Sequence, residues 1–261
     1  MRSSSVTKVS VISRPEIESF VVLRSPRGYV VSMLKMFLFS LLVCTSAWAQ
    51  ETWLVATLDW PPYTCSKCHR NGTAADALRK ALAAQGIIIE FVFYPWVQAQ
   101  KNGGKKNFVG YFPSWEDEVL PGFTASKSLF SSPVIFVERK DKPLVWKDLK
   151  DLKGKTFAVT RGYGNTAEFN ALIKNGDLKT ITVLSEDSTL RRLVQGSVDG
   201  VLMDLRVAEY YLKNDFAKYA DKIAINPKVV ENKSLHMAFN QYHKAKKQKL
   251  DGITLKVPAS F

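Results

Sequence analysis

Residues 196–204 read GSVDGVLMD, and the organisation of the whole chain is centred on them. The apolar run Val201–Met203 is typical of a short buried strand, which ends at the carboxylate of Asp204. Ligands of open α/β sheets bind beyond the carboxyl ends of the strands, so Asp204 can hold a positively charged group of a ligand. It can equally cap a helix that begins near Arg206, because Asp is a preferred N-cap residue. The local pattern leaves both interpretations open.

Strands and helices alternate around this stretch in two series, each typical of a mostly parallel sheet. In the first series we expect strands at residues 52–58, 87–94 and 108–112, with helices that start at 73 and 95. A long loop over 113–129 and a strand at 134–137 follow. In the second series we expect strands at 156–160, 180–184 and 201–203, with helices over 167–174, 188–195 and 207–212. If a final strand at 235–239 returns to the first series, the chain crosses between two lobes twice.

Two turns at predicted strand ends carry further candidate ligand contacts. The first, DWPPY at residues 59–63, is held extended by its prolines and places Trp60 where it can cover a ligand or pack into the core. The second, RGYGNT at residues 161–166, leads into a helix whose free amides favour an anion. Gly162 lets the backbone approach a ligand closely, and Arg161 offers a charged fork suited to a carboxylate. An ordinary tight turn with Arg161 in water is the alternative.

The first 49 residues are set apart by an export signal. Lys35 precedes the mostly apolar run Phe37–Cys44, and a small-x-small cleavage site ends at Ala49. The apolar run is shorter than the roughly 20 residues needed to span a membrane. Residues 1–32 fit no signal and indicate an overextended start. We therefore predict that residues 1–49 are removed and that the mature protein lies in the periplasm.

The chain is basic, with a formal net charge of +13. Removing the six basic and two acidic residues of the export segment leaves +9 on the mature chain. A basic chain can bind nucleic acid, but these lysines are scattered over predicted surface faces. We interpret the charge as solvated surface and expect no nucleic-acid partner.

The mature chain keeps two cysteines, Cys65 and Cys68, within CSKCH at residues 65–69. This spacing is that of covalent haem c attachment, but no flanking helices would enclose a haem. A zinc site formed with His69 would lack a fourth ligand at a familiar spacing. In an oxidising compartment such a pair most often forms a disulfide. We predict a disulfide between Cys65 and Cys68, with no metal and no cofactor.

Six short motifs follow one another along most of the predicted mature chain. They are WPPY 60–63, FSSP 130–133, DL 148–149, DLKGK 151–155, RG 161–162 and GSVDGVLMD 196–204. Their order and spacing resemble those of the bacterial extracellular solute-binding protein family 3, the periplasmic receptors of polar amino-acid ABC importers. The resemblance implies an α/β, two-lobed type II periplasmic binding protein-like fold with two hinge crossovers. We expect lobe 1 to comprise residues 50–138 and 234–261, and lobe 2 to comprise residues 139–233.

The resemblance also implies a set of seven ligand contacts, namely Trp60, Tyr111, Ser114, Arg161, Gly162, Thr166 and Asp204. In this set Asp204 would hold the amino group of the ligand, the turn after Arg161 its carboxylate, and Trp60 its side chain. Family members usually carry an arginine shortly before the Phe-Ser-x-Pro segment, and residues 113–129 contain none. Either Arg161 replaces it or the ligand is not a standard α-amino acid. The chain also ends sooner after its last predicted strand than family members usually do.

We therefore expect a monomeric, non-catalytic receptor that captures a small polar, amino-bearing solute and delivers it to an inner-membrane ABC permease. An enzyme on the same fold, such as a cyclohexadienyl dehydratase-like lyase, is the alternative. Such an enzyme would need a general acid in the cleft, for which Glu116 is the candidate. A haem c electron carrier built on residues 65–69 is a third hypothesis.

Overall fold

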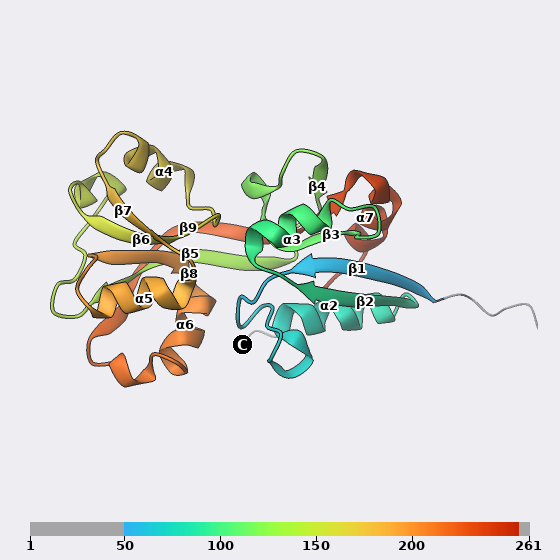
Figure 1. Cartoon of the computed structure of the whole chain (residues 1–261), viewed down its shortest axis with the longest axis horizontal. Coiled ribbons are helices and arrows are strands. Elements are labelled where there is room, and N and C mark those ends of the chain that lie inside the picture. The colour runs from blue at the N-terminus through green and yellow to red at the C-terminus, as the bar shows by residue number, and fades with distance from the viewer. Residues whose placement is uncertain (1–49, 256–261) are drawn as a thin grey trace, which may run out of the picture. The chain divides into compact units, whose positions relative to one another are not determined.

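The computed structural model describes residues 50–255, and the predicted export signal at 1–49 lies outside the described residues. Within residues 50–255, nine strands form one sheet in the order β2-β1-β3-β9-β5-β8-β6-β7, with β4 paired to β9 (Figure 1). No helix in this part of the chain is long and apolar enough to cross a membrane.

The first lobe is built around β1, which lies between β2 and β3 and runs parallel to both. Its elements are β1 (Glu51–Thr57), α2 (Thr73–Ala83), β2 (Ile87–Phe93), α3 (Trp96–Gly103) and β3 (Gly110–Trp115). Helix α2 buries an apolar stripe of Ala74, Leu78 and Leu82, which lie four residues apart and therefore on one face. The predicted β-α-β-α-β order is confirmed here.

The second lobe repeats this arrangement around β6, which lies between β7 and β8 and is parallel to both. Its elements are β6 (Thr156–Thr160), α4 (Ala167–Lys174), β7 (Lys179–Val183), α5 (Glu186–Val194), β8 (Gly200–Asp204) and α6 (Leu205–Lys213). Short 3-10 helices, η3 (Leu149–Leu152) and η4 (Ala217–Tyr219), flank them. Phe157 of β6 meets Phe169 of α4 edge to face, with ring centroids 5.2 Å apart, and both side chains are fully buried.

Two long antiparallel strands join the lobes. The first, β5 (Phe130–Arg139), pairs with β8, and the second, β9 (Ile223–Asn240), pairs with β3. The two strands also pair with each other, and their register shifts on either side of Ile135. Figure 1 shows β5 and β9 running between the two groups of strands. The chain therefore crosses between the lobes twice, as predicted.

The chain returns to the first lobe after β9. There η5 (Gln241–His243) and α7 (Lys244–Asp251) are the last regular elements of the part of the chain that the structure describes. The ammonium groups of Lys246 and Lys249 donate to the Glu51 carboxylate at 2.7 and 2.6 Å, which ties α7 to β1.

Two segments are more regular than the sequence predicts. The expected loop at 113–129 contains the end of β3, the 3-10 helix η2 (Glu116–Glu118) and the strand β4 (Phe123–Ala125). The expected last strand at 235–239 begins at Ile223 instead, because β9 continues through the polar run Glu231–Ser234. The run lacks the apolar alternation on which a strand prediction rests. It is held in the sheet by backbone pairing with β5, which the local sequence does not reveal.

The loop between β1 and α2 contains the predicted disulfide, which joins Cys65 to Cys68 and is followed by η1 (His69–Asn71). Because each sulfur is bonded to the other, neither is free to form a thioether to a haem. No group of three or more metal-ligating side chains gathers anywhere in residues 50–255.

Candidate functional site

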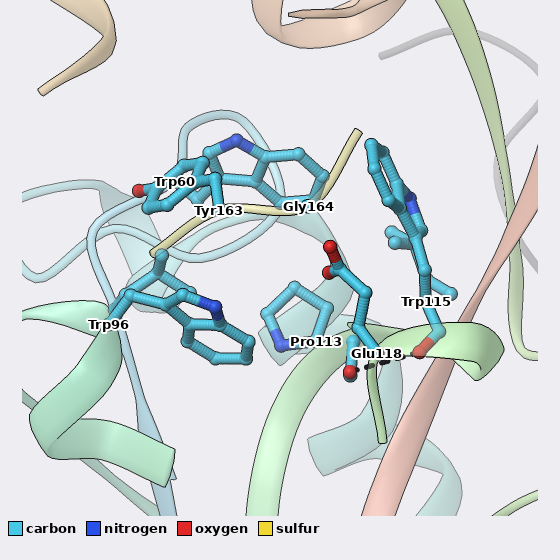
Figure 2. Close-up of a pocket in the computed structure, with 10 residues that line it drawn as sticks. Trp60, Trp96, Pro113, Trp115, Glu118, Tyr163 and Gly164 are labelled. Carbon is cyan, nitrogen blue, oxygen red and sulfur yellow. Dashed lines mark hydrogen bonds between the residues drawn. The ribbon is translucent and has the colours of Figure 1, made fainter. Parts of the chain in front are cut away.

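A small cavity lies where the turn after β6 meets the end of β3 and the start of α3. It has a volume of about 40 Å³, which is room for about three water molecules. Three tryptophans and one tyrosine line it, together with one carboxylate: Trp60, Trp96, Trp115, Tyr163 and Glu118. We call the four rings the aromatic cage. Figure 2 shows the Glu118 carboxylate pointing in among these rings.

Separate elements hold the four rings in place. Trp60 lies in the turn after β1 and stacks on Tyr63, with ring centroids 4.9 Å apart. Trp96 begins α3, and its indole meets the Tyr111 ring edge to face at 5.4 Å. Trp115 ends β3, and Tyr163 follows β6 in the second lobe. Because the rings come from separate elements of both lobes, the cage needs the folded state of both lobes.

Glu118 is the polar centre of the cavity. Its Oε1 atom is buried and has no hydrogen-bond partner among the described residues. The pKa of Glu118 is raised to about 7, chiefly by burial and also by Asp117, whereas Lys233 acts in the opposite direction. The carboxylate lies against the backbone of Gly164, where an added Cβ would stand 0.9 Å from Oε1. An unpaired carboxylate with this environment attracts either a proton or a cationic group.

Asp204 does cap a helix. Its Oδ1 atom accepts from the backbone amides of Arg206 and Val207 at 2.8 and 3.0 Å, at the start of α6. Its Oδ2 atom accepts from the hydroxyls of Ser132 and Tyr63 at 2.6 and 3.0 Å. Burial raises the pKa of Asp204, and these four donors act in the opposite direction. The side chain is only 1% exposed and is absent from the lining of the cavity.

Asp204 is nevertheless connected to the cage. The indole N–H of Trp115 donates to the hydroxyl of Ser132 at 2.9 Å, and Ser132 in turn donates to Asp204. This buried chain of hydrogen bonds links β8 to β3 through β5. Asp204 therefore orients a ring of the aromatic cage without touching the cavity.

A second buried acid, Glu186, begins α5 next to Trp60. The pKa of Glu186 is raised to about 8, chiefly by burial and to a smaller extent by Asp204, whereas the indole N–H of Trp60 acts in the opposite direction. The indole and the carboxylate do not reach hydrogen-bond geometry, and Glu186 Oε2 has no partner among the described residues. Glu186, Tyr163 and Arg161 line a hollow beside the cavity.

The structure brings two of the seven predicted contact residues to the cavity, namely Trp60 and Ser114. The exposed Arg161 lines the adjacent hollow. Gly162 has φ +78° and lies against Val97 of α3. Thr166 caps α4 by accepting from the Phe169 amide at 3.3 Å. The cavity lining does not include these three residues.

Tyr111 is fully buried, and its hydroxyl accepts from the Leu120 amide at 2.9 Å. Its ring supports the Trp96 indole through the edge-to-face contact given above. The candidate acid Glu116 is exposed and faces another hollow, whereas Glu118, two residues later, enters the cavity. Sequence reasoning missed Glu118, Trp96, Trp115 and Tyr163. The available signal was the SWEDE run at 114–118, where a tryptophan and three acids follow a predicted strand.

We expect Glu186 to make the fold less stable as the pH rises. Its folded pKa of about 8 is above the ordinary value of 4.5, so the folded state holds a proton that the unfolded state has lost. The stability that this proton contributes is complete below pH 4.5 and is lost as the pH rises through about 8. Glu186→Gln should therefore raise the melting temperature relative to the parent more at pH 9 than at pH 5.

Thermal unfolding followed by circular dichroism at several pH values measures this effect. Glu168→Gln, at an exposed position of α4, is the matched control and should follow the parent at every pH. Parallel curves for Glu186→Gln and the parent would show that Glu186 ionises normally in the folded protein.

Comparison with solved structures shows that this fold occurs in other proteins. The GluR0 ligand-binding core from Nostoc punctiforme, in complex with L-glutamate, is similar over 76% of this chain and 91% of its own, with 21% identity and a TM-score of 0.59. An ancestral arginine-binding protein bound to arginine is similar over 77% of this chain and 89% of its own, with 19% identity and a TM-score of 0.64.

A third structure comes from work on glutathione import through GshT and the cystine ABC importer TcyBC of Streptococcus mutans. It is similar over 77% of this chain and 87% of its own, with 16% identity and a TM-score of 0.62. No family model and no curated protein matches the sequence. Two α/β lobes, two crossing strands and this likeness together show that the chain has the two-lobed fold of type II periplasmic binding proteins, as its resemblance to solute-binding protein family 3 implies.

Proposed function

We propose that the protein is a periplasmic receptor that captures a small amino-bearing solute between its lobes for an inner-membrane ABC importer. The observation that carries the proposal is the cavity itself, in which the aromatic cage surrounds the unpaired Glu118 carboxylate. Binding pockets are typically apolar and contain a few converging polar groups. The fold supports the same role, since proteins that share it were solved with bound glutamate and arginine.

The proposal assigns contacts to residues of both lobes, with lobe 1 as 50–138 and 234–261 and lobe 2 as 139–233. Trp60 and Ser114 would touch the ligand directly. Arg161 and the turn from Gly162 to Thr166 would meet it only if the ligand extends past Tyr163. Asp204 would receive an amine only by exchanging its hydrogen bonds from the Tyr63 and Ser132 hydroxyls, and Tyr111 would act through Trp96.

Direct binding measurements test the proposal. The purified full chain is denatured and the released small molecules are identified by mass spectrometry, and calorimetry then follows rebinding of amino acids, amines and methylated ammonium compounds. Trp60→Ala should weaken binding about tenfold or more, because it removes one wall of the cavity. Tyr242→Ala changes an exposed aromatic residue outside the cavity and should leave affinity unchanged. If no solute is released and none binds, the receptor role is wrong.

The enzymatic alternative is now supported by a different residue from the one predicted. Glu118, with a pKa near 7, is matched to general acid catalysis at neutral pH, whereas Glu116 lies in solvent. Incubation of the parent with cyclohexadienyl acids is the discriminating assay. Turnover that is lost in Glu118→Gln while binding is retained would favour an enzyme, and absence of turnover in the parent would exclude this reaction.

A further inference from the structure

We propose that the solute captured in this cavity is an organic cation with a methylated ammonium head group and no carboxylate beside it. The inference rests on the proposed receptor function and specifies the class of ligand. Four observations carry it: the arrangement of the rings, the hydrogen-bonding capacity of the lining, the distribution of charge and the size of the cavity.

The arrangement of the rings is suited to a cation. Faces of aromatic rings attract cations, tryptophan most strongly, and surrounding rings are the usual means of recognising quaternary ammonium groups. Here Trp60 and Tyr163 lie on one side of the Glu118 carboxylate, with Trp96 and Trp115 on two others (Figure 2). A head group at the centre would contact several rings and the carboxylate at once.

The hydrogen-bonding capacity of the lining disfavours a primary ammonium group. Such a group has three N–H donors, but the indole nitrogens of the cage also only donate. The Ser114 hydroxyl donates its proton to the Trp115 carbonyl at 3.0 Å, which leaves its oxygen able to accept, and Figure 2 shows the Tyr163 hydroxyl pointing away from Glu118. Among the side chains that line the cavity, Glu118 and Ser114 are therefore the acceptors available to these three N–H donors. A buried N–H without an acceptor is unfavourable, whereas a quaternary ammonium group has no N–H to satisfy.

The distribution of charge disfavours a ligand carboxylate in the cavity. The lining contains one acid and no Lys, Arg or His. The basic group that lowers the pKa of Glu118 is Lys233. Its ammonium group pairs with Asp117 at 2.5 Å and lies 4.6 Å from the centroid of the Trp115 ring, outside the cavity lining. Arg161 lies in the adjacent hollow, and residues 113–129 contain no arginine. A ligand carboxylate would meet Glu118 without a compensating cation, at a cost that increases with burial.

The size of the cavity is closer to that of a compact head group than to that of most complete amino acids. A volume of about 40 Å³ accommodates only a few non-hydrogen atoms. The rest of a longer cation would extend into the adjacent hollow lined by Tyr163 and Glu186.

The test is calorimetry of the full chain with tetramethylammonium, choline, methylammonium, glycine betaine and L-arginine as chloride salts or free compounds. Tetramethylammonium and choline should bind at least tenfold more tightly than methylammonium and glycine betaine. Trp96→Leu should weaken tetramethylammonium binding about tenfold. Trp96→Phe should keep most of the parent's affinity, because phenylalanine still presents a ring face.

The pH dependence of binding provides a second readout. Glu118 must lose its proton to pair with a cation, so tetramethylammonium affinity should increase about tenfold from pH 6 to pH 8. The titratable and charged groups that influence Glu118 or are influenced by it are Asp117, Lys233 and Tyr111. Glu118→Gln should weaken binding and remove this pH dependence, whereas Glu116→Gln, on the same short helix but exposed, should bind like the parent.

The outcomes separate the inference from the function on which it rests. If L-arginine or methylammonium binds through Trp60 and tetramethylammonium does not, the receptor role stands and the methylated-cation inference is wrong. If tetramethylammonium binds equally well to Trp96→Leu and Glu118→Gln, it binds elsewhere and the inference is also wrong. If no compound binds and no solute is released on denaturation, the receptor function itself fails.

Discussion

Asp204→Ala is expected to lower the free energy of unfolding by roughly 3–5 kcal/mol. Loss of the N-cap of α6 accounts for about 1 kcal/mol of this. The remainder comes from the hydroxyls of Ser132 and Tyr63, which lose a charged acceptor at a site that is 1% exposed. Urea unfolding followed by tryptophan fluorescence measures the change.

Two variants identify the cause of that loss. Asp204→Asn keeps a good N-cap residue but presents an amide to two hydroxyl donors, so it should recover only part of the stability. Asp215→Ala removes an exposed acid after α6 and should change stability by less than about 0.5 kcal/mol. A loss below about 1 kcal/mol for Asp204→Ala would show that the buried hydrogen-bond chain contributes little.

Gly110→Ala is expected to destabilise the fold by about 3 kcal/mol or more. Gly110 begins β3 opposite Phe239 of β9, and a Cβ at this position would stand 1.9 Å from the backbone oxygen of Ala238. That oxygen belongs to the central strand of the sheet, so it cannot move aside without breaking the pairing between β3 and β9. Chemical denaturation and the yield of soluble protein report the effect.

Gly104→Ala is the matched control for this substitution. The closest atoms to a Cβ at Gly104 lie 3.4 and 3.5 Å away, which is ordinary contact. Its backbone is in the right-handed helical region, so alanine is tolerated there and should leave stability unchanged or slightly higher. Equal stabilities of the two variants would mean that β3 and β9 can separate locally at little cost.

Much of the fold could be predicted from the sequence because the apolar strands and amphipathic helices of both lobes carry local signals. The strands at 156–160 and 201–203 and the helix at 167–174 are found at, or within one residue of, their predicted bounds. The first half of β9 gave no such signal. This segment forms a strand because it pairs with β5, which lies about ninety residues away in the sequence. Local sequence patterns do not contain that information.

The candidate site was less predictable for the same reason. Trp60 could be placed because it follows β1 at a strand end, whereas Ser114 was implied by the family resemblance alone. Glu116 and Glu118 are the same residue type two positions apart, so the sequence does not show which of them enters the cavity. Their positions on the short helix η2 leave Glu116 exposed and turn Glu118 inward. Asp204 fitted two interpretations, and the choice depended on Ser132 and Tyr63, which are distant in sequence.

The pairing of β5 with β9 has a mechanical consequence. Two independent tethers would let the halves of the molecule swing in any direction, whereas hydrogen-bonded strands deform together as one ribbon. The register shifts beside Ile135 place the local bending and extra twist at one level of that ribbon. Torsion about this level would separate Tyr163 from Trp96 and so would open the cavity to the proposed ligand.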